Sequence, residues 1–106
     1  MIDEPTIQKI GAMLAAAAGP SRVILFGSQA RNNAGEESDI DLLVVEPMVN
    51  NRLLEMTRLR QVLRPLRIPV DLLVCSLSEL NERARISSGA IHWALHEGRI
   101  IHDSLG

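Results

Sequence analysis

Short apolar runs alternate with segments of helical periodicity along this chain. Residues 23–26 and 42–45 contain no polar position, which is typical of strands buried on both faces of a sheet. Residues 67–75 form a third run, interrupted by Asp71, and residues 99–102 predict a short terminal extended segment. The pattern therefore predicts a small sheet with little exposed surface.

Helical periodicity and capping residues fill the segments between these strands. Pro5, after two acidic residues, begins a helix that Gly19 and Pro20 end, with the apolar positions Ile7, Ile10, Leu14 and Ala17 facing the core. A second helix is predicted from about Asn51 to Leu66, capped by Asn50 or Asn51 and ended at Pro65, with Met56, Leu59, Leu63 and Leu66 on its buried face.

Two further helices follow the Asp71 strand. Ser76 to Glu79 (SLSE) is a capping-box pattern that opens one of them, and residues 86–97 predict the last, closed by Gly98. The order is helix, strand, short helix, strand, helix, strand, helices. This order predicts an α+β fold, a small mixed β-sheet flanked by helices, in a single domain over residues 1–106.

Composition supports a compact domain in the cytoplasm. Apolar residues make up 46% of the chain and charged residues 23%, which is ordinary for a globular protein. The acidic N-terminus does not resemble a signal peptide, and no apolar stretch is long enough to cross a membrane. The single cysteine, Cys75, lies in an apolar run and is expected to be a buried, inert thiol.

Two carboxylates stand at the entry of the second strand. Asp39 and Asp41 are two residues apart, so in an extended strand both side chains leave the same face with Cα atoms about 7 Å apart. Their mutual repulsion is removed when they share a divalent cation, and Mg²⁺ favours one or two carboxylates plus phosphate oxygens. The pair therefore predicts a metal and phosphate site.

A phosphate cradle is predicted at the end of the first strand. Gly27 allows a close backbone approach or a positive φ, and Ser28 is a good N-cap for a short helix through Arg31. The free N–H groups and the positive end of such a helix attract phosphate. A glycine-serine turn is common, however, and on its own is a weak signal.

Asp71 is the third acid. An ionised carboxylate inside a buried strand is costly without a cation or donors around it, so we place Asp71 at the same metal site. An ion pair with one of the arginines is the alternative. If the two strands are neighbours, the three acids and the cradle are suited to Mg²⁺-dependent phosphoryl or nucleotidyl transfer.

This motif resembles that of a known superfamily. Gly27-Ser28, ten residues, Asp39-Ile40-Asp41-Leu42 and a later strand with Asp71 are similar to the nucleotidyltransferases that include DNA polymerase beta and the aminoglycoside nucleotidyltransferases. With 106 residues the chain looks like a minimal nucleotidyltransferase (MNT), the antitoxin commonly paired with a HEPN-domain ribonuclease in prokaryotic toxin–antitoxin systems.

The resemblance implies a nucleotidyltransferase fold and a role for each motif residue. Asp39 and Asp41 would ligate two Mg²⁺ ions, and Asp71 would bind metal and help to deprotonate the attacking hydroxyl. Gly27, Ser28 and Arg31 would hold the triphosphate of ATP. Where relatives often have glycine after the Ala-Arg pair, this chain has Asn32, which tolerates similar backbone angles.

Three functions stay open at this point. The first is transfer of AMP from ATP to a hydroxyl of a partner protein, which by resemblance is a tyrosine of a HEPN toxin. The second is a non-enzymatic antitoxin or nucleotide-binding adaptor that acts by binding alone. The third is modification of a small-molecule antibiotic.

Charge and aromatic content argue against direct nucleic-acid binding. The net charge is −2, and Phe26 and Trp93 are the only aromatic rings apart from histidine. Ten of the eleven basic residues are arginine, and Arg60, Arg64 and Arg67 share one face of the second predicted long helix, as a solvated surface or as a patch for an acidic partner or a nucleotide.

The last predicted helix carries two histidines. His92 and His96 have the spacing of a zinc pair, but no further ligand completes a site in the sequence, so surface or interface histidines are the simpler interpretation. Trp93 is an anchor either for the core or for a partner.

Overall fold

The computed structural model describes residues 3–27, 40–83 and 89–105 of the chain, with the backbone alone at Ala90 and Trp93. The helices are α1 (Glu4–Ala18), α3 (Arg52–Leu63), α4 (Leu77–Arg83) and α5 (Ala90–Glu97), with one 3₁₀ turn, η1 (Arg64–Leu66). The strands are β1 (Arg22–Phe26), β2 (Ile40–Glu46), β3 (Val70–Ser76) and β4 (Arg99–Asp103).

The strands form one mixed sheet in the order β3-β2-β1-β4. β1 is antiparallel to β2 and β4, whereas β2 and β3 are parallel and are joined by a crossover through α3. The predicted α+β class with a small mixed sheet is confirmed.

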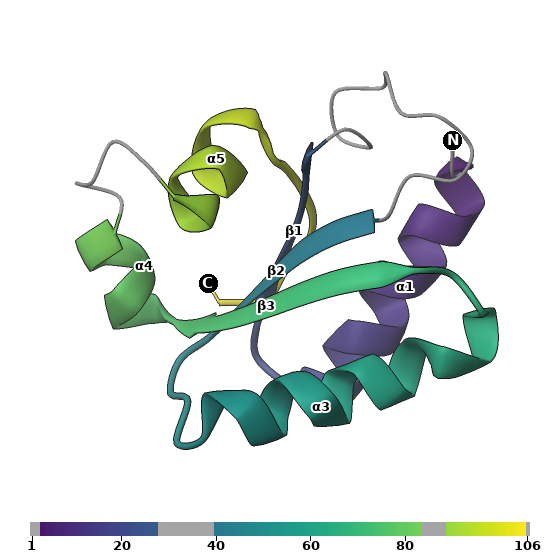
Figure 1. The fold of residues 1–106 in the computed structure, drawn as a ribbon, viewed down its shortest axis with the longest axis horizontal. Helices are drawn as coiled ribbons and strands as arrows, with labels where there is room; N and C mark the ends of the chain where they lie inside the picture. The colour runs from purple at the N-terminus through teal and green to yellow at the C-terminus, as the bar shows by residue number, and fades with distance from the viewer. Residues whose placement is uncertain (1–2, 28–39, 84–88, 106) are drawn as a thin grey trace.

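Helices cover both faces of the sheet, α1 and α3 on one side and α4 and α5 on the other (Figure 1). Because side chains alternate along a strand, the apolar runs supply both cores at once. Leu42 and Val44 of β2 pack toward α1 and α3, and Leu43 and Val45 pack in the cluster that contains Leu80 of α4 and Ala94 of α5. The continuous apolar runs are thus explained by burial on both faces.

Most predicted helix boundaries agree with the structure. The Asp3 side chain accepts the N–H of Thr6 at the start of α1, and Asn51 accepts that of Leu54 at the start of α3. Ser76 and Glu79 make the reciprocal capping box, with Ser76 Oγ accepting the Glu79 N–H and Glu79 Oε1 accepting the Ser76 N–H, both at 3.2 Å.

Two helices are shorter in the structure than the sequence predicts. α3 ends at Leu63, and Pro65 lies in the 3₁₀ turn that follows. The predicted start of the last helix at Ile86 is wrong, because Gly89 has φ 99° and ψ 168° and the helix begins at Ala90. A glycine with positive φ interrupts the helical pattern that the apolar spacing suggests.

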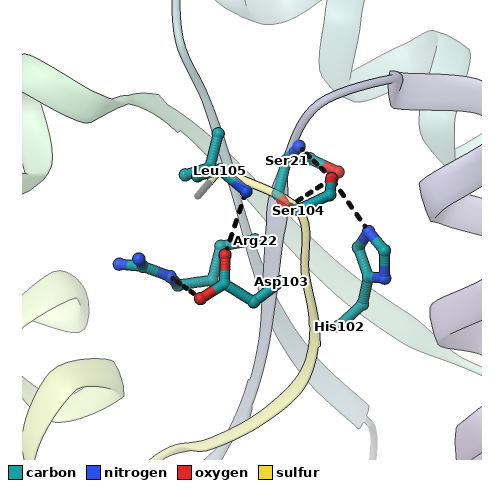
Figure 2. A network of polar contacts seen from close by, with 6 residues as sticks. All are labelled: Ser21, Arg22, His102, Asp103, Ser104 and Leu105. Atoms are coloured by element: carbon teal, nitrogen blue, oxygen red, sulfur yellow. Dashed lines mark hydrogen bonds and ion pairs between the residues drawn. The ribbon is translucent and has the colours of Figure 1, made fainter.

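A polar network fixes β4 to the start of β1 (Figure 2). The N–H of Ser21, a fully buried residue, donates to Ser104 Oγ at 3.0 Å, and the N–H of Ser104 donates to the Ser21 carbonyl oxygen at 2.8 Å. Arg22 Nε lies 3.1 Å from Asp103 Oδ2. These contacts satisfy backbone groups that would otherwise be buried without partners, so they hold the edge strand in place.

Cys75 is 1% exposed and lies in the cluster between the sheet, α4 and α5, as expected. Burial raises the pKa of its thiol to about 11, which keeps it protonated and unreactive at neutral pH. Among the helices that the structure describes, none has both the length and the apolar character that crossing a membrane requires.

Glu46, the last residue of β2, is a buried acid that the sequence analysis did not single out. Burial raises the pKa of Glu46 to about 7, and hydrogen bonding to the neighbouring Glu55 adds to this effect. Arg58 donates to both carboxylate oxygens of Glu55, at 2.8 and 2.7 Å, and lowers the pKa of Glu55 to about 2.

We expect the raised pKa of Glu46 to make stability fall as pH increases. Above its ordinary pKa the unfolded chain ionises Glu46 freely, whereas the folded protein must ionise a buried carboxyl, so the loss accumulates between about pH 5 and pH 8. Glu55 is ionised in both states over most of this window. Urea unfolding should show wild type losing about 2 kcal/mol more than Glu46→Gln across this range. Exposed Glu82→Gln is the control; a parallel pH profile for Glu46→Gln and wild type would contradict this expectation.

Candidate functional site

The topology of the sheet brings three segments together at one end. β1 runs antiparallel to β2, so the last residues of β1 lie beside the first residues of β2. β2 and β3 are parallel, so their first residues lie beside each other as well. In Figure 1 this end of β2 and β3 lies away from α4, which follows the last residue of β3.

Asp41 and Asp71 are brought together at this end. They are register partners in the parallel pair, so both side chains leave the same face of the sheet, from Cα atoms about 5 Å apart. That face is the one covered further along by α4 and α5, since Leu43 and Leu73, two residues on, pack in that cluster. Two carboxylates from adjacent strands therefore lie side by side.

The exposure of Asp71 corrects one step of the sequence argument. Asp71 is exposed and Asp41 is half-buried, so the cost of burying an ionised Asp71 does not apply. At the start of an edge strand a carboxylate remains in contact with water. Asp71 makes no ion pair with any arginine that the structure describes. The register with Asp41, rather than burial, links it to the site.

Gly27 completes the described part of the site. Its φ is +74°, and a Cβ atom there would lie 3.1 Å from Asp41 Cγ, 3.4 Å from Asp41 Cβ, and would overlap Asp41 Oδ2. The chain thus turns immediately after β1 in a conformation that glycine favours, with its backbone against the Asp41 carboxylate. A side chain at position 27 would fill this space.

The donor set fits Mg²⁺. Two carboxylates on one face, beside a glycine that leaves room for a ligand, are the kind of oxygen donors that Mg²⁺ takes together with phosphate. Asp39, Ser28 and Arg31 lie outside the described residues, so their parts in the site stay predictions from the sequence. The same holds for the short helix expected after Gly27.

Two residues further along each strand, on the same face, Leu43 and Leu73 line a small pocket, which we call the Leu43–Leu73 pocket. It has a volume of about 220 Å³, and its lining includes Leu43, Leu73, Ile91 and the cationic side chains of Arg52 and Arg83. Arg52 is paired with Glu79, whereas Arg83 has no ion pair within the described segments. The pocket combines an apolar floor with positive charge.

The arginines at the end of α3 share a larger groove. Arg60, Arg64 and Arg67 line about 470 Å³ together with apolar residues that include Leu63 and Ile68. None of the three pairs with a carboxylate that the structure describes. Of the three, only Arg60 lies in α3, because that helix ends at Leu63; Arg64 lies in η1 and Arg67 follows it with a φ of 55°. The three arginines therefore share a groove rather than one helix face, and Val70, the residue before Asp71, also lines this groove.

The two histidines of α5 lie together, with ring centroids 4.2 Å apart. Over the described ranges, no group of three or more histidine, cysteine, aspartate or glutamate residues has the arrangement of a metal site. The zinc alternative for His92 and His96 gains no support from these residues.

Comparison with protein-family models decides the family. The model described as nucleotidyltransferase domain matches residues 9–92, which run from α1 into α5 and include Gly27, Asp41 and Asp71. The chain belongs to the nucleotidyltransferase domain family. The resemblance inferred from the motif is thereby confirmed. No curated protein matches the chain by sequence.

Solved structures share the fold of this nucleotidyltransferase domain. A toxin–antitoxin structure with AMP-PNP has a TM-score of 0.60 at 19% identity, covering 91% of this chain and 73% of the other. The Shewanella oneidensis complex of a tri-AMPylated HEPN toxin with its MNT antitoxin gives 0.60 at 18%, covering 96% and 73%. A putative nucleotidyltransferase from Sulfolobus solfataricus gives 0.58 at 23%, covering 88% and 73%. At these identities the likeness concerns the fold.

Proposed function

We propose that this nucleotidyltransferase domain transfers AMP from ATP to a hydroxyl group of a partner protein, and that it is the antitoxin of a HEPN toxin. The observation that carries the proposal is the register pairing of Asp41 with Asp71 beside Gly27. The family supports nucleotidyl transfer. The similar fold of an MNT antitoxin solved with an AMPylated HEPN toxin supports the choice of partner.

The carboxylates have distinct parts in the proposed reaction. Asp41, with Asp39 from the same motif, would hold Mg²⁺, which would supply positive charge to the bound triphosphate. Asp71, on the adjacent strand, would orient the acceptor hydroxyl and take its proton. The exposure of Asp71 suits this part, since a protein acceptor must reach it from solvent.

The chemical step is an in-line displacement at the α-phosphorus. The acceptor oxygen forms a bond to the α-phosphorus as the bond to the bridging oxygen of pyrophosphate breaks. The hydroxyl proton passes to Asp71 and then to water, and pyrophosphate leaves with the bonding electron pair. Bound Mg²⁺ would supply positive charge that offsets the charge on the α-phosphate and on the leaving pyrophosphate.

Two features on the carboxylate face provide space for a nucleotide. The Leu43–Leu73 pocket lies on the same face and adds the positive charge of Arg83, which suits an anionic ligand with an apolar ring. Gly27 lets the backbone approach that ligand. We propose that the nucleotide occupies this side of the sheet.

The position of the label tests the proposal. The protein is incubated with Mg²⁺ and the product of the adjacent reading frame, with ATP labelled at the α-phosphate in one reaction and at the γ-phosphate in the other. AMP transfer leaves label on the partner only from α-labelled ATP, because the γ-phosphate departs in pyrophosphate. Label from the γ-position would indicate phosphorylation instead. Neutralisation of the partner without any label would favour the adaptor that acts by binding.

A further inference from the structure

The opposite end of β2 carries a third pocket, which the proposed reaction does not use. Glu46 lies five residues along β2 from Asp41, about 16 Å away, and its side chain leaves the other face of the sheet. The pocket has a volume of about 370 Å³, and its lining includes Glu46, Met48, Leu54, Glu55 and Arg58. We call it the Glu46 pocket.

Large apolar side chains stand exposed around the Glu46 pocket. Met48 is 76% exposed, Leu53 73% and Leu54 66%, and these are three of the four large apolar residues that the structure shows most exposed in its described part. They lie within one short stretch, the loop after β2 and the first turn of α3. Such a concentration is a common mark of a surface that meets a partner.

One carboxyl oxygen of Glu46 in this pocket has no hydrogen-bond donor in the part of the chain that the structure describes. Glu46 is 7% exposed, and its Oε2 atom meets no hydrogen-bond donor among the described residues. A buried acceptor in this state costs free energy until a donor reaches it. The pocket is therefore prepared to receive a hydrogen-bond donor from outside.

The cation that acts on Glu46 among the described residues, Arg58, is already engaged. Its Nε and Nη2 atoms donate to Glu55, and its Nη1 atom donates to the carbonyl oxygen of Ala17 at 2.9 Å. Glu55 and Arg58, both from α3, are the charged groups that act on Glu46. Because Arg58 bonds both carboxylate oxygens of Glu55, its charge only weakly stabilises an ionised Glu46. Glu46 can therefore still bind a second cation.

We propose that the Glu46 pocket binds an arginine or lysine side chain of a protein partner. The apolar stem of such a side chain fits against Met48 and Leu54, and its cationic head reaches the carboxylate of Glu46. The exposed Leu53 extends the contact beyond the pocket. The partner protein of the proposed function is the simplest candidate to carry this arginine or lysine. Binding in the Glu46 pocket does not itself require AMP transfer.

Binding of a cation to Glu46 must release a proton near neutral pH. The pKa of Glu46 is raised to about 7, so at pH 6 the carboxyl is mostly protonated and at pH 8 mostly ionised. A cationic ligand selects the ionised form. Affinity should therefore increase by about tenfold from pH 6 to pH 8, as the ionised fraction rises.

The first experiment uses N-acetyl-arginine amide as the probe, with N-acetyl-citrulline amide as its neutral counterpart of equal shape. Titrations followed by NMR should show saturable binding of the arginine probe, with a dissociation constant on the order of 1 mM, tighter at pH 8 than at pH 6. Glu46→Gln should abolish both the binding and its pH dependence. Equal responses to the two probes, no saturation at pH 8, or unchanged binding by Glu46→Gln would overturn the proposal.

A matched pair of leucine variants tests the pocket with a protein partner. Leu54→Ala removes a lining residue, whereas Leu53→Ala removes a neighbour that is equally exposed but does not line the pocket. Against the protein labelled by α-labelled ATP, calorimetry should show at least about tenfold weaker binding for Leu54→Ala and about twofold or less for Leu53→Ala. Equal affinities would show that the partner docks elsewhere. If no protein is labelled, the proposed function fails. The titration with N-acetyl-arginine amide still tests whether the Glu46 pocket binds a cation.

Discussion

Asp41→Asn and Asp71→Asn are each expected to reduce AMP transfer by about three orders of magnitude. The amide keeps the shape of the carboxylate but loses the negative charge that binds a divalent cation or accepts a proton. Several kcal/mol of charge stabilisation at the reacting phosphate then disappear, and each 1.36 kcal/mol is about tenfold in rate. The measurement is the rate at which α-label from ATP appears on the partner.

The control for this pair is Asp103→Asn, which changes an exposed carboxylate on the edge strand β4 and leaves the candidate site intact. It should transfer at the wild-type rate. Asp41→Asn and Asp71→Asn should also shift the midpoint of urea unfolding only slightly, because Asp71 is exposed and Asp41 half-buried. Wild-type transfer by a folded Asp71→Asn variant would remove Asp71 from the mechanism.

Gly27→Ala is expected to lower transfer by about a hundredfold, because the added Cβ overlaps the Asp41 carboxylate oxygen and displaces it. A misplacement of about 1 Å is enough for an effect of this size. Alanine at a φ of +74° should also cost about 1–2 kcal/mol of stability. Transfer rate and urea unfolding are measured on the same preparation.

Gly19→Ala separates these two effects. Gly19 has the same φ of +74°, yet a Cβ there meets no atom within 4 Å. It should lose at least as much stability, because its ψ of −144° lies outside the left-handed helical region, and it should keep full activity. If both variants lose activity equally, the loss comes from general destabilisation, and the close approach of Gly27 to Asp41 has no special importance.

Local signals predicted much of the fold. The cap at Asn51 and the capping box at Ser76 are short-range features, and each makes the expected hydrogen bond. The apolar runs gave the strands because burial on both faces leaves no polar position in them. The predicted site required the two acid-bearing strands to be neighbours. In the structure they are, and Asp41 and Asp71 are register partners.

Features that depend on contacts between distant residues were not foreseen. The exposure of Asp71 follows from the position of β3 at the sheet edge, which its own apolar sequence does not indicate. The Ser21–Ser104 contact joins residues 83 apart in the chain. The Glu46 pocket combines a strand end with a helix start, and nothing in the sequence around Glu46 distinguishes it from a solvated glutamate.

The parallel alignment of β2 with β3 restricts how this protein can change in length. Alternation along a strand means that one residue inserted between Asp71 and Leu72, while the buried Leu72 and Val74 keep their places, would move the Asp71 carboxylate to the face of α1 and α3, away from its counterpart on β2. Residues added to the loop before α3 leave that alignment untouched. Deletions and insertions should therefore be tolerated in the loop before α3 and excluded from the first residues of β2 and β3.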